Sequence, residues 1–188
     1  NHPSQTLIDM MTIRQLKGRL DHLTIGFCGD LKFGRTVHSL VNSLVRFPGN
    51  TFYFISPDEL RVPEYLVEDT LKPSNTTYHE VTDLEATIPK LDVLYMTRGQ
   101  KERFFNEEDY IRLKGTYILT ADKLKLAAPD MPVLHPLPRV DEITLDVDDD
   151  SRAAYFDQVQ NGVYLRMALI MSLLGIPDPQ TKEEILSC

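Results

Sequence analysis

The sequence predicts an α/β fold: a doubly wound, mostly parallel sheet with helices on both faces. Short apolar runs rich in β-branched and aromatic residues alternate with stretches of helical periodicity. Polar loops containing glycine or proline separate them, and this alternation is typical of a parallel sheet covered by helices. The expected strands are residues 24–28, 51–55, 76–81, 92–96, 116–119 and 131–134, and the expected helices are residues 5–17, 36–46, 63–69, 83–88, 107–113, 121–126 and 154–174.

The first and last helices stand out by their apolar residues. Ser4 is the expected N-cap of the first helix, and Gly18 is its expected end. Apolar residues cover more than one face of this helix, which indicates burial on more than one side. The last helix carries one apolar stripe, made of Phe156, Val159, Val163, Met167, Ile170 and Leu174.

The strands between them are defined by their composition and their ends. Residues 51–55 read Thr-Phe-Tyr-Phe-Ile, all β-formers, after a Phe-Pro-Gly-Asn turn. Residues 92–96 are apolar after Asp92 and run into a loop with cationic and amide groups. Residues 131–134 run into His-Pro-Leu-Pro-Arg at 135–139, where the prolines fix the backbone and allow a cis bond at Leu137-Pro138.

Composition excludes several classes of protein. The 188 residues are 42% hydrophobic and 26% charged, as in globular proteins, and no run approaches the roughly 20 apolar residues that cross a bilayer. The formal net charge of −8 argues against a nucleic-acid binder. Cys28 and Cys188 lack a zinc-ligand spacing, so we expect a reducing, cytoplasmic setting. The chain starts at Asn1 without a signal segment, and we expect it to be a piece of a longer chain.

Arginines follow several of the expected strands, and they suggest a site for a small anion. They are Arg35, Arg98, Arg103 and Arg139. Arg35 and Arg98 can each clamp a carboxylate at two points, and Gln100 can supply an amide. The carbonyl groups around Pro136 and Leu137 can accept from an ammonium group. Two carboxylate clamps beside an ammonium acceptor describe an acidic amino acid as the ligand.

Two further groups of residues have plainer interpretations. His38 is expected to be a helix histidine at the boundary of the core. The acidic residues 141–150 are expected to form a solvated surface, because their spacing matches no calcium loop, and no metal site is predicted.

The loop after the first strand allows a competing interpretation. Gly29-x-x-x-x-Gly34-Arg35-Thr36 imitates a phosphate-binding P-loop with arginine in place of lysine. A nucleotide-hydrolysing enzyme also needs an acidic magnesium partner after an apolar strand, whereas Asp92 precedes its strand. A P-loop-like nucleotide binder therefore stays an alternative interpretation.

Four long motifs, in order along the chain, resemble the catalytic chain of the aspartate carbamoyltransferase family. They are His-Pro-Ser-Gln-Thr-Leu at 2–7, Gly-Asp-Leu-Lys-Phe-Gly-Arg-Thr-Val-His-Ser at 29–39, Tyr-Met-Thr-Arg-Gly-Gln-Lys-Glu-Arg at 95–103 and His-Pro-Leu-Pro-Arg-Val-Asp-Glu-Ile at 135–143. Tyr155-Phe156 and Asn161-Gly162 continue the likeness, which runs to about Leu174. The related ornithine enzymes share the His-Pro-x-Gln start, whereas Arg98-Gly99-Gln100 looks like the aspartate branch.

The resemblance implies a Rossmann-like domain and a specific reaction without a cofactor. The family transfers the carbamoyl group of carbamoyl phosphate to the amino group of L-aspartate, giving N-carbamoyl-L-aspartate and phosphate for pyrimidine biosynthesis. By resemblance, Arg35, Arg98 and Gln100 bind aspartate, and His2 and Gln5 face carbamoyl phosphate. Leu137 and Pro138 offer carbonyl groups to both substrates. His2 and Arg98 would be catalytic, with His2 stabilising charge on the carbonyl oxygen.

The resemblance also implies a missing part. The family's N-terminal carbamoyl-phosphate domain, with its Ser-Thr-Arg-Thr loop, has no counterpart here. We therefore expect an interdomain helix and site edge at 1–22, an aspartate-binding domain at 23–153, an interdomain helix at 154–175 and a tail at 176–188. The first and last helices should expose apolar surface, and this chain should not be active alone. Full-length relatives form homotrimers, in some cases with regulatory chains. A non-catalytic aspartate-binding module is the other open interpretation.

Overall fold

The computed structural model describes residues 2–98 and 117–177. Its centre is a five-stranded parallel sheet with the order β3-β2-β1-β4-β5. The strands are β1 (Thr24–Cys28), β2 (Thr51–Ile55), β3 (Thr77–Val81), β4 (Val93–Met96) and β5 (Val133–Leu134). The chain moves outward from β1 to β3 and then returns to the other side of β1, so the order reverses between β1 and β4. The expected doubly wound fold is confirmed.

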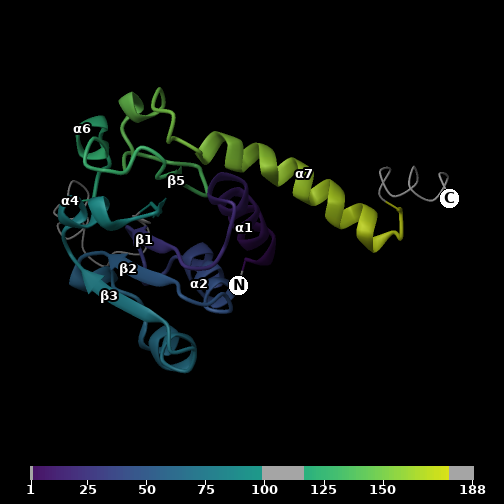
Figure 1. Cartoon of the computed structure of the whole chain (residues 1–188), viewed down its shortest axis with the longest axis horizontal. Helices are drawn as coiled ribbons and strands as arrows, with labels where there is room; N and C mark the ends of the chain where they lie inside the picture. The colour runs from purple at the N-terminus through teal and green to yellow at the C-terminus, as the bar shows by residue number, and fades with distance from the viewer. Residues whose placement is uncertain (1, 99–116, 178–188) are drawn as a thin grey trace.

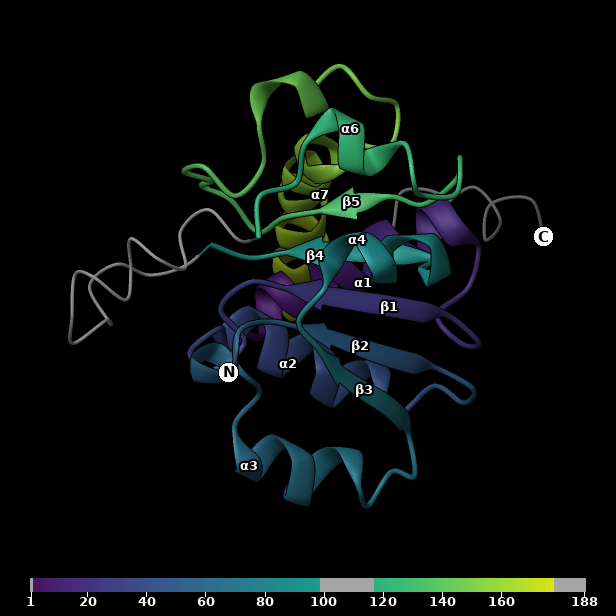
Figure 2. The same ribbon diagram turned by 90° about the vertical axis from the view of Figure 1, so that its left-hand side faces the viewer.

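Helices cover both faces of this sheet (Figures 1 and 2). One face carries α1 (Pro3–Lys17) and α2 (Arg35–Leu44), and the other carries α4 (Leu84–Thr87) and α6 (Ala121–Leu124). A short helical stretch, α3 (Glu64–Leu66), continues as a π-helix (Val67–Leu71) near the β3 edge. The long last helix α7 (Tyr155–Leu173) packs on α1 and then extends away from the body.

Two apolar cores fill the space between the sheet and its helices. On the α1 and α2 side, Phe27, Phe52 and Phe54 pack against one another and against the apolar face of α2. On the other side, Met96 and Val133 pack with residues of α4 and α6. Burying each of these side chains contributes about 1.5–3 kcal/mol. The two cores therefore hold the sheet rigid, and the loops that follow its strands can present functional side chains.

Several sequence-based boundaries are corrected by the structure. The N-cap of α1 is His2 rather than Ser4, because Pro3 occupies the first helical turn, where its missing N–H costs nothing. Residues 117–119 of the expected strand 116–119 form no strand; Leu119 makes only an isolated bridge with Ile143. The expected strand 131–134 is reduced to its last two residues. The expected helix 107–113 and the tail from 178 lie outside the described residues.

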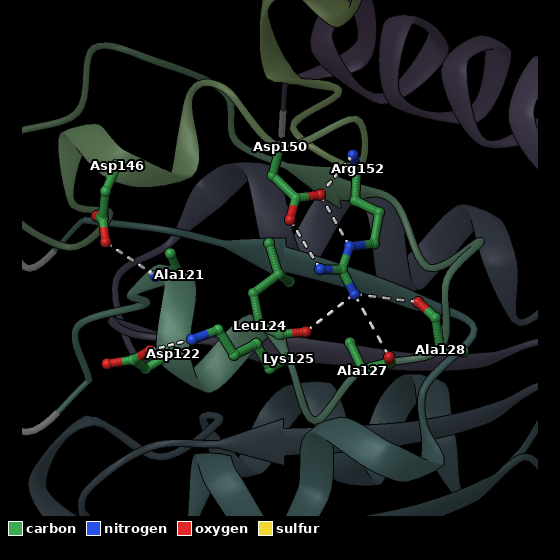
Figure 3. Close-up of polar contacts among 9 residues, drawn as sticks. All are labelled: Ala121, Asp122, Leu124, Lys125, Ala127, Ala128, Asp146, Asp150 and Arg152. Carbon is green, nitrogen blue, oxygen red and sulfur yellow. Dashed lines mark hydrogen bonds and ion pairs between the residues drawn. The ribbon is translucent and has the colours of Figure 1, made fainter.

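The acidic segment 141–150 is not simply a solvated surface, as the sequence suggested. The carboxylate of Asp150 accepts from the guanidinium Nε and Nη2 of Arg152 at 2.9 and 2.7 Å. The same guanidinium donates through Nη1 to carbonyl oxygens at and after the end of helix α6, those of Leu124, Ala127 and Ala128 (Figure 3). Asp146 accepts from the N–H of Ala121 at the start of that helix. Asp146 thus holds the start of α6, and Arg152, which Asp150 orients, holds its end.

The apolar stripe expected on α7 is present, but it faces outward in this chain. Its six residues are between 47% and 69% exposed. The side of α7 that packs on α1 is instead polar: Asn161 donates to Thr12 Oγ1 at 3.0 Å and to Gln15 Oε1 at 2.7 Å. On α1, Leu7 and Leu16 are also exposed. The expectation that both helices expose apolar surface is confirmed.

Candidate functional site

The candidate site lies where the strand order of the sheet reverses. Ligands of open α/β sheets bind outside the carboxyl ends of the strands at such a point. Arg35 begins helix α2 after β1, Arg98 follows β4, and residues 135–139 follow β5. In the sheet register, Cys28 is paired with Met96, and Tyr95 with Leu134, so these three strand ends are neighbours. Gln100 and Arg103 lie outside the described residues.

The loops after β1 and β4 touch through their backbones. Thr97 N–H donates to the carbonyl oxygen of Cys28 at 2.9 Å, and Gly29 N–H donates to that of Ile55 at 3.1 Å. Gly29 has φ +120°, and a Cβ there would lie 2.1 Å from the carbonyl oxygen of Thr97. Glycine is therefore required at position 29 for the loops bearing Arg35 and Arg98 to approach each other.

A buried histidine fixes the loop that precedes Arg35. His38 Nε2 lies 2.7 Å from the carbonyl oxygen of Leu31, and His38 Nδ1 lies 2.7 Å from the hydroxyl of Tyr65. A carbonyl only accepts, so Nε2 carries the proton and Nδ1 accepts from Tyr65. The expectation that His38 is a helix histidine at the boundary of the core is confirmed, since its side chain is buried and fully paired.

His2 and Gln5 lie at the start of α1, beside the α2 end of the site. The backbone N–H of His2 donates to Ser39 Oγ at 2.7 Å, which joins the start of α1 to α2. Gln5 donates through Nε2 to Asp9 Oδ1 at 2.7 Å. The side chain of Gln5 lines a cavity of about 190 Å³ together with Ile8, His135, Pro136, Gln158, Val159, Gly162 and Arg166.

Asp9 is a buried carboxylate that the sequence interpretation missed. Its side chain is fully buried, and it accepts from Gln5 Nε2, from Gln158 Nε2 at 2.6 Å and from the hydroxyl of Tyr95 at 3.0 Å. Burial raises the pKa of Asp9 to about 6, although the three hydrogen bonds oppose that rise. Asp9 therefore joins α1, β4 and α7 beneath the candidate site.

The 135–139 loop is held by its own hydrogen bonds. The N–H of Leu137 donates to His135 Nδ1 at 2.8 Å, so Nε2 carries the ring proton and donates to Glu142 Oε1 at 2.7 Å. Burial opposes ionisation of Glu142, but its hydrogen bonds from His135 and from the backbone outweigh this and lower its pKa. Leu137 has φ +47°, and the Leu137-Pro138 bond is cis, one of the two geometries that the sequence left open.

Arg139 does not belong to the anion pocket that the sequence suggested. Its guanidinium makes a two-point ion pair with Asp148, and it also donates to the hydroxyl of Tyr155 at 3.3 Å. These contacts hold the pKa of Asp148 below its usual range. Arg139 therefore fastens the end of the loop to the start of α7.

The geometry speaks against the P-loop alternative. Asp92 Oδ2 accepts from the backbone N–H of Thr24 at 2.7 Å, which places Asp92 at the amino ends of β1 and β4. A magnesium partner would be needed at the opposite, carboxyl ends. Across residues 2–98 and 117–177, no group of three or more His, Cys, Asp or Glu side chains is arranged to hold a metal ion. In the same ranges, no helix has the length and apolarity needed to cross a membrane.

Comparisons with known proteins agree on one family. Residues 21–173 match the family model described as aspartate/ornithine carbamoyltransferase, Asp/Orn binding domain. The aspartate carbamoyltransferase catalytic subunit of Lachnoclostridium phytofermentans is 64% identical over 176 residues, which are 94% of this chain and 57% of the relative. The corresponding subunit of Clostridium acetobutylicum is 59% identical over 175 residues, with 93% and 57% coverage. This chain thus spans about 57% of the length of these curated relatives.

Solved structures give the same result. The catalytic subunit of M. jannaschii aspartate transcarbamoylase superposes with a TM-score of 0.87 at 45% identity, covering 93% of this chain and 56% of that chain. The aspartate transcarbamoylase of Trypanosoma cruzi, solved in complex with carbamoyl aspartate and phosphate, gives a TM-score of 0.82 at 40% identity, with 92% and 54% coverage.

Proposed function

The chain belongs to the aspartate/ornithine carbamoyltransferase family, and from that premise we propose that it is the amino-acid-binding part of an aspartate carbamoyltransferase. The complete enzyme would transfer the carbamoyl group of carbamoyl phosphate to L-aspartate, giving N-carbamoyl-L-aspartate and phosphate. The names of the two clostridial relatives support aspartate over ornithine as the acceptor, and so does the complex of the T. cruzi protein with carbamoyl aspartate and phosphate. We propose that this step belongs to pyrimidine biosynthesis and takes place in the cytoplasm.

The observation that carries this proposal is the position of two arginines at the switch point of the sheet. Arg35 and Arg98 follow the adjacent strands β1 and β4, and the loops that bear them touch at Gly29 and Thr97. Each guanidinium presents a planar fork of donors that matches a carboxylate. We assign the two carboxylates of aspartate to Arg35 and Arg98, with Gln100 assisting.

The carbamoyl phosphate side of the site is assigned to the start of α1 and the loop after β5. His2 is anchored by its backbone to α2, and Gln5 lines the cavity beside Pro136. His2 would donate to the carbonyl oxygen of carbamoyl phosphate, where negative charge builds during attack. Leu137 and Pro138 would present backbone carbonyl groups, which accept from the amino groups of both substrates.

The reaction is then accelerated by the positioning of the two substrates and by electrostatic stabilisation of the transition state. The neutral amino group of aspartate attacks the carbonyl carbon, and the new C–N bond forms as the bond from that carbon to the phosphate oxygen breaks. Phosphate leaves with the electron pair, and it takes up the proton that the amino nitrogen loses. Holding the two substrates in this geometry can supply roughly 7–11 kcal/mol of the barrier. His2 and Arg98 are the residues to which we assign catalytic roles.

The phosphate-binding part of the site would come from protein outside this chain. The relatives are longer, and this chain covers about 57% of them. We therefore propose domain boundaries at 1–22, 23–153, 154–175 and 176–188, with residues 1–22 and 154–175 crossing to a carbamoyl-phosphate domain. The 188-residue chain would not turn over alone, and the complete protein would assemble as a homotrimer.

A chimera tests this function. The part of the L. phytofermentans relative that this chain does not cover is joined to this chain, and formation of N-carbamoyl-L-aspartate is measured for the chimera and for the chain alone. We expect turnover by the chimera only. Arg98→Ala in the chimera should lower kcat/KM for aspartate about 100-fold, since it removes two charged hydrogen bonds of roughly 1.5 kcal/mol each.

The matched control is Arg19→Ala, because Arg19 is exposed and lies before the amino end of β1. It should leave kcat/KM unchanged. A folded chimera that binds aspartate without turnover would instead identify a non-catalytic binding module. Full activity of Arg98→Ala would refute the assigned role of Arg98.

A further inference from the structure

The buried carboxylate of Asp9 fixes the orientation of two nearby amide side chains. An ionised carboxylate has acceptors only, so any amide that contacts it must turn its nitrogen toward it. Asp9 Oδ1 accepts hydrogen bonds from two such nitrogens, Gln5 Nε2 at 2.7 Å and Gln158 Nε2 at 2.6 Å. Tyr95 donates to the other oxygen, Oδ2.

The orientation of Gln158 is supported by an independent contact. The backbone N–H of His135 donates to Gln158 Oε1 at 2.9 Å, and a backbone N–H can only donate. The oxygen of Gln158 therefore points to the 135–139 loop, and its nitrogen is left for Asp9. One carboxylate thus orders α7 and, through it, the loop that carries Leu137 and Pro138.

For Gln5, the same constraint leaves the amide oxygen available as an acceptor. Its nitrogen is held by Asp9, and no hydrogen bond within the described residues uses its Oε1. Among the described residues, Gln5 Oε1 is not one of the buried side-chain atoms that lack a partner. Solvent therefore reaches this oxygen. Gln5 lines the 190 Å³ cavity beside Pro136, and a ligand there can donate an N–H to this oxygen.

We propose that Asp9 is a positioning residue that makes this site selective for an acyl phosphate whose acyl group bears an N–H donor. Carbamoyl phosphate has that donor; acetyl phosphate has the same shape with a methyl group in its place. This role of Asp9 rests on the proposed function, and it explains why the site would accept a carbamoyl group rather than an acetyl group. Buried hydrogen-bonding groups discriminate strongly against analogues that leave them unpaired.

The environment of Asp9 suits this role at neutral pH. Its pKa of about 6 leaves the carboxylate ionised at pH 7.5, where it accepts from both glutamines. Asparagine at this position keeps the pattern, because one amide oxygen accepts from Gln5 and Gln158 while the amide nitrogen donates to the hydroxyl of Tyr95. Leucine has a similar size and no acceptor.

The test compares Asp9→Leu with Asp9→Asn in the chimera described above. The readout is the ratio of kcat/KM for carbamoyl phosphate to that for acetyl phosphate, at saturating aspartate and pH 7.5. We expect Asp9→Leu to lower this ratio about 10-fold or more, and Asp9→Asn to keep it within about 3-fold of the parent. Equal losses for both acyl phosphates in Asp9→Leu would show a purely structural role and overturn the inference.

A second measurement does not need Asp9→Leu to fold. NMR of the 188-residue chain at pH 7.5 should detect the hydrogen bond from Gln5 Nε2 to Asp9 Oδ1, as a scalar coupling between the amide nitrogen of Gln5 and the carboxyl carbon of Asp9. A Gln5 amide with no such coupling and with random-coil shifts would refute the orientation. If the parent chimera is inactive, the proposed function fails, while the NMR result still decides the orientation of Gln5.

Discussion

Gly29 and Thr97 lie so close that no side chain fits between them. A Cβ on Gly29 would sit 2.1 Å from the carbonyl oxygen of Thr97, and the backbone at Gly29 has φ +120°. This contact couples the loop after β1 to the loop after β4. The spacing of the two arginines proposed to bind aspartate therefore depends on a position that has no side chain of its own.

Gly29→Ala should destabilise the chain by several kcal/mol, through backbone clash and through a positive φ that costs roughly 1–2 kcal/mol by itself. Gly18→Ala is the matched control, because Gly18 has φ +72° and open space where its Cβ would stand. It should cost only about 1 kcal/mol. Urea unfolding of the three proteins measures both effects, and equal losses would show that the Thr97 contact is unimportant.

Asp9 should make stability fall as pH rises. Its pKa is 3.8 in the unfolded reference and about 6 in the folded chain, so the folded state binds more protons between these values. The stability contributed by protonated Asp9 is present below pH 4 and is lost by about pH 6, roughly 3 kcal/mol in total.

The measurement is the difference in unfolding free energy between the parent and Asp9→Asn at pH 4 and pH 7. The hydrogen-bonded ion pair with Arg152 lowers the pKa of Asp150 to about 2, so Asp150 makes stability rise with pH. This contribution is the same in both proteins and cancels in the difference. A difference that stays constant from pH 4 to pH 7 would contradict the raised pKa.

Glu142→Ala should lower stability by about 1–3 kcal/mol, because it leaves the buried Nε2–H of His135 without an acceptor. It also removes the acceptor of the Val140 and Asp141 N–H groups. Asp149→Ala is the control, since Asp149 lies in the same acidic segment but is exposed. Thermal unfolding should separate the two variants by several degrees. Coincident melting curves would mean that the loop is held by other contacts.

The outward stripe of α7 should make the isolated chain associate with itself and bind a hydrophobic dye. Met167 and Ile170 are more than half exposed on that stripe. Met167→Glu with Ile170→Glu should reduce both effects, whereas Asp157→Glu at the other end of the helix should not. A parent chain that sediments as a monomer and binds no dye would contradict the expectation that the apolar stripe of α7 drives association.

The sheet was predictable from the sequence, and its least regular edge was not. Residues 24–28 and 51–55 were predicted to the residue, because β-branched and aromatic residues there are bounded by glycine and proline turns. Residues 117–119 have similar apolar character, but Leu119 pairs with Ile143 outside the sheet. Local composition fixes a tendency to be extended and says nothing about which strand is the neighbour.

The loops of the candidate site were predictable from motifs, and the polar network beneath them was not. Arg35 was expected at a helix start and begins α2. Asp9, by contrast, reads as an ordinary polar helix residue, because its partner Gln158 lies 149 positions away. The stripe on α7 was found, but its direction was not, since periodicity gives a face and only tertiary contacts decide which way that face points.

The contacts between α1 and α7 also constrain the order in which this chain can be completed during synthesis. Asp9 and Gln158, like Thr12 and Asn161, are separated by 149 residues. At about 5–20 residues per second on the ribosome, α1 would wait roughly 7–30 seconds for these partners to be made. Until then Asp9 has Gln5 and at most Tyr95 as hydrogen-bond donors. The packing of α1 against α7 is therefore expected to be a late step of folding during synthesis.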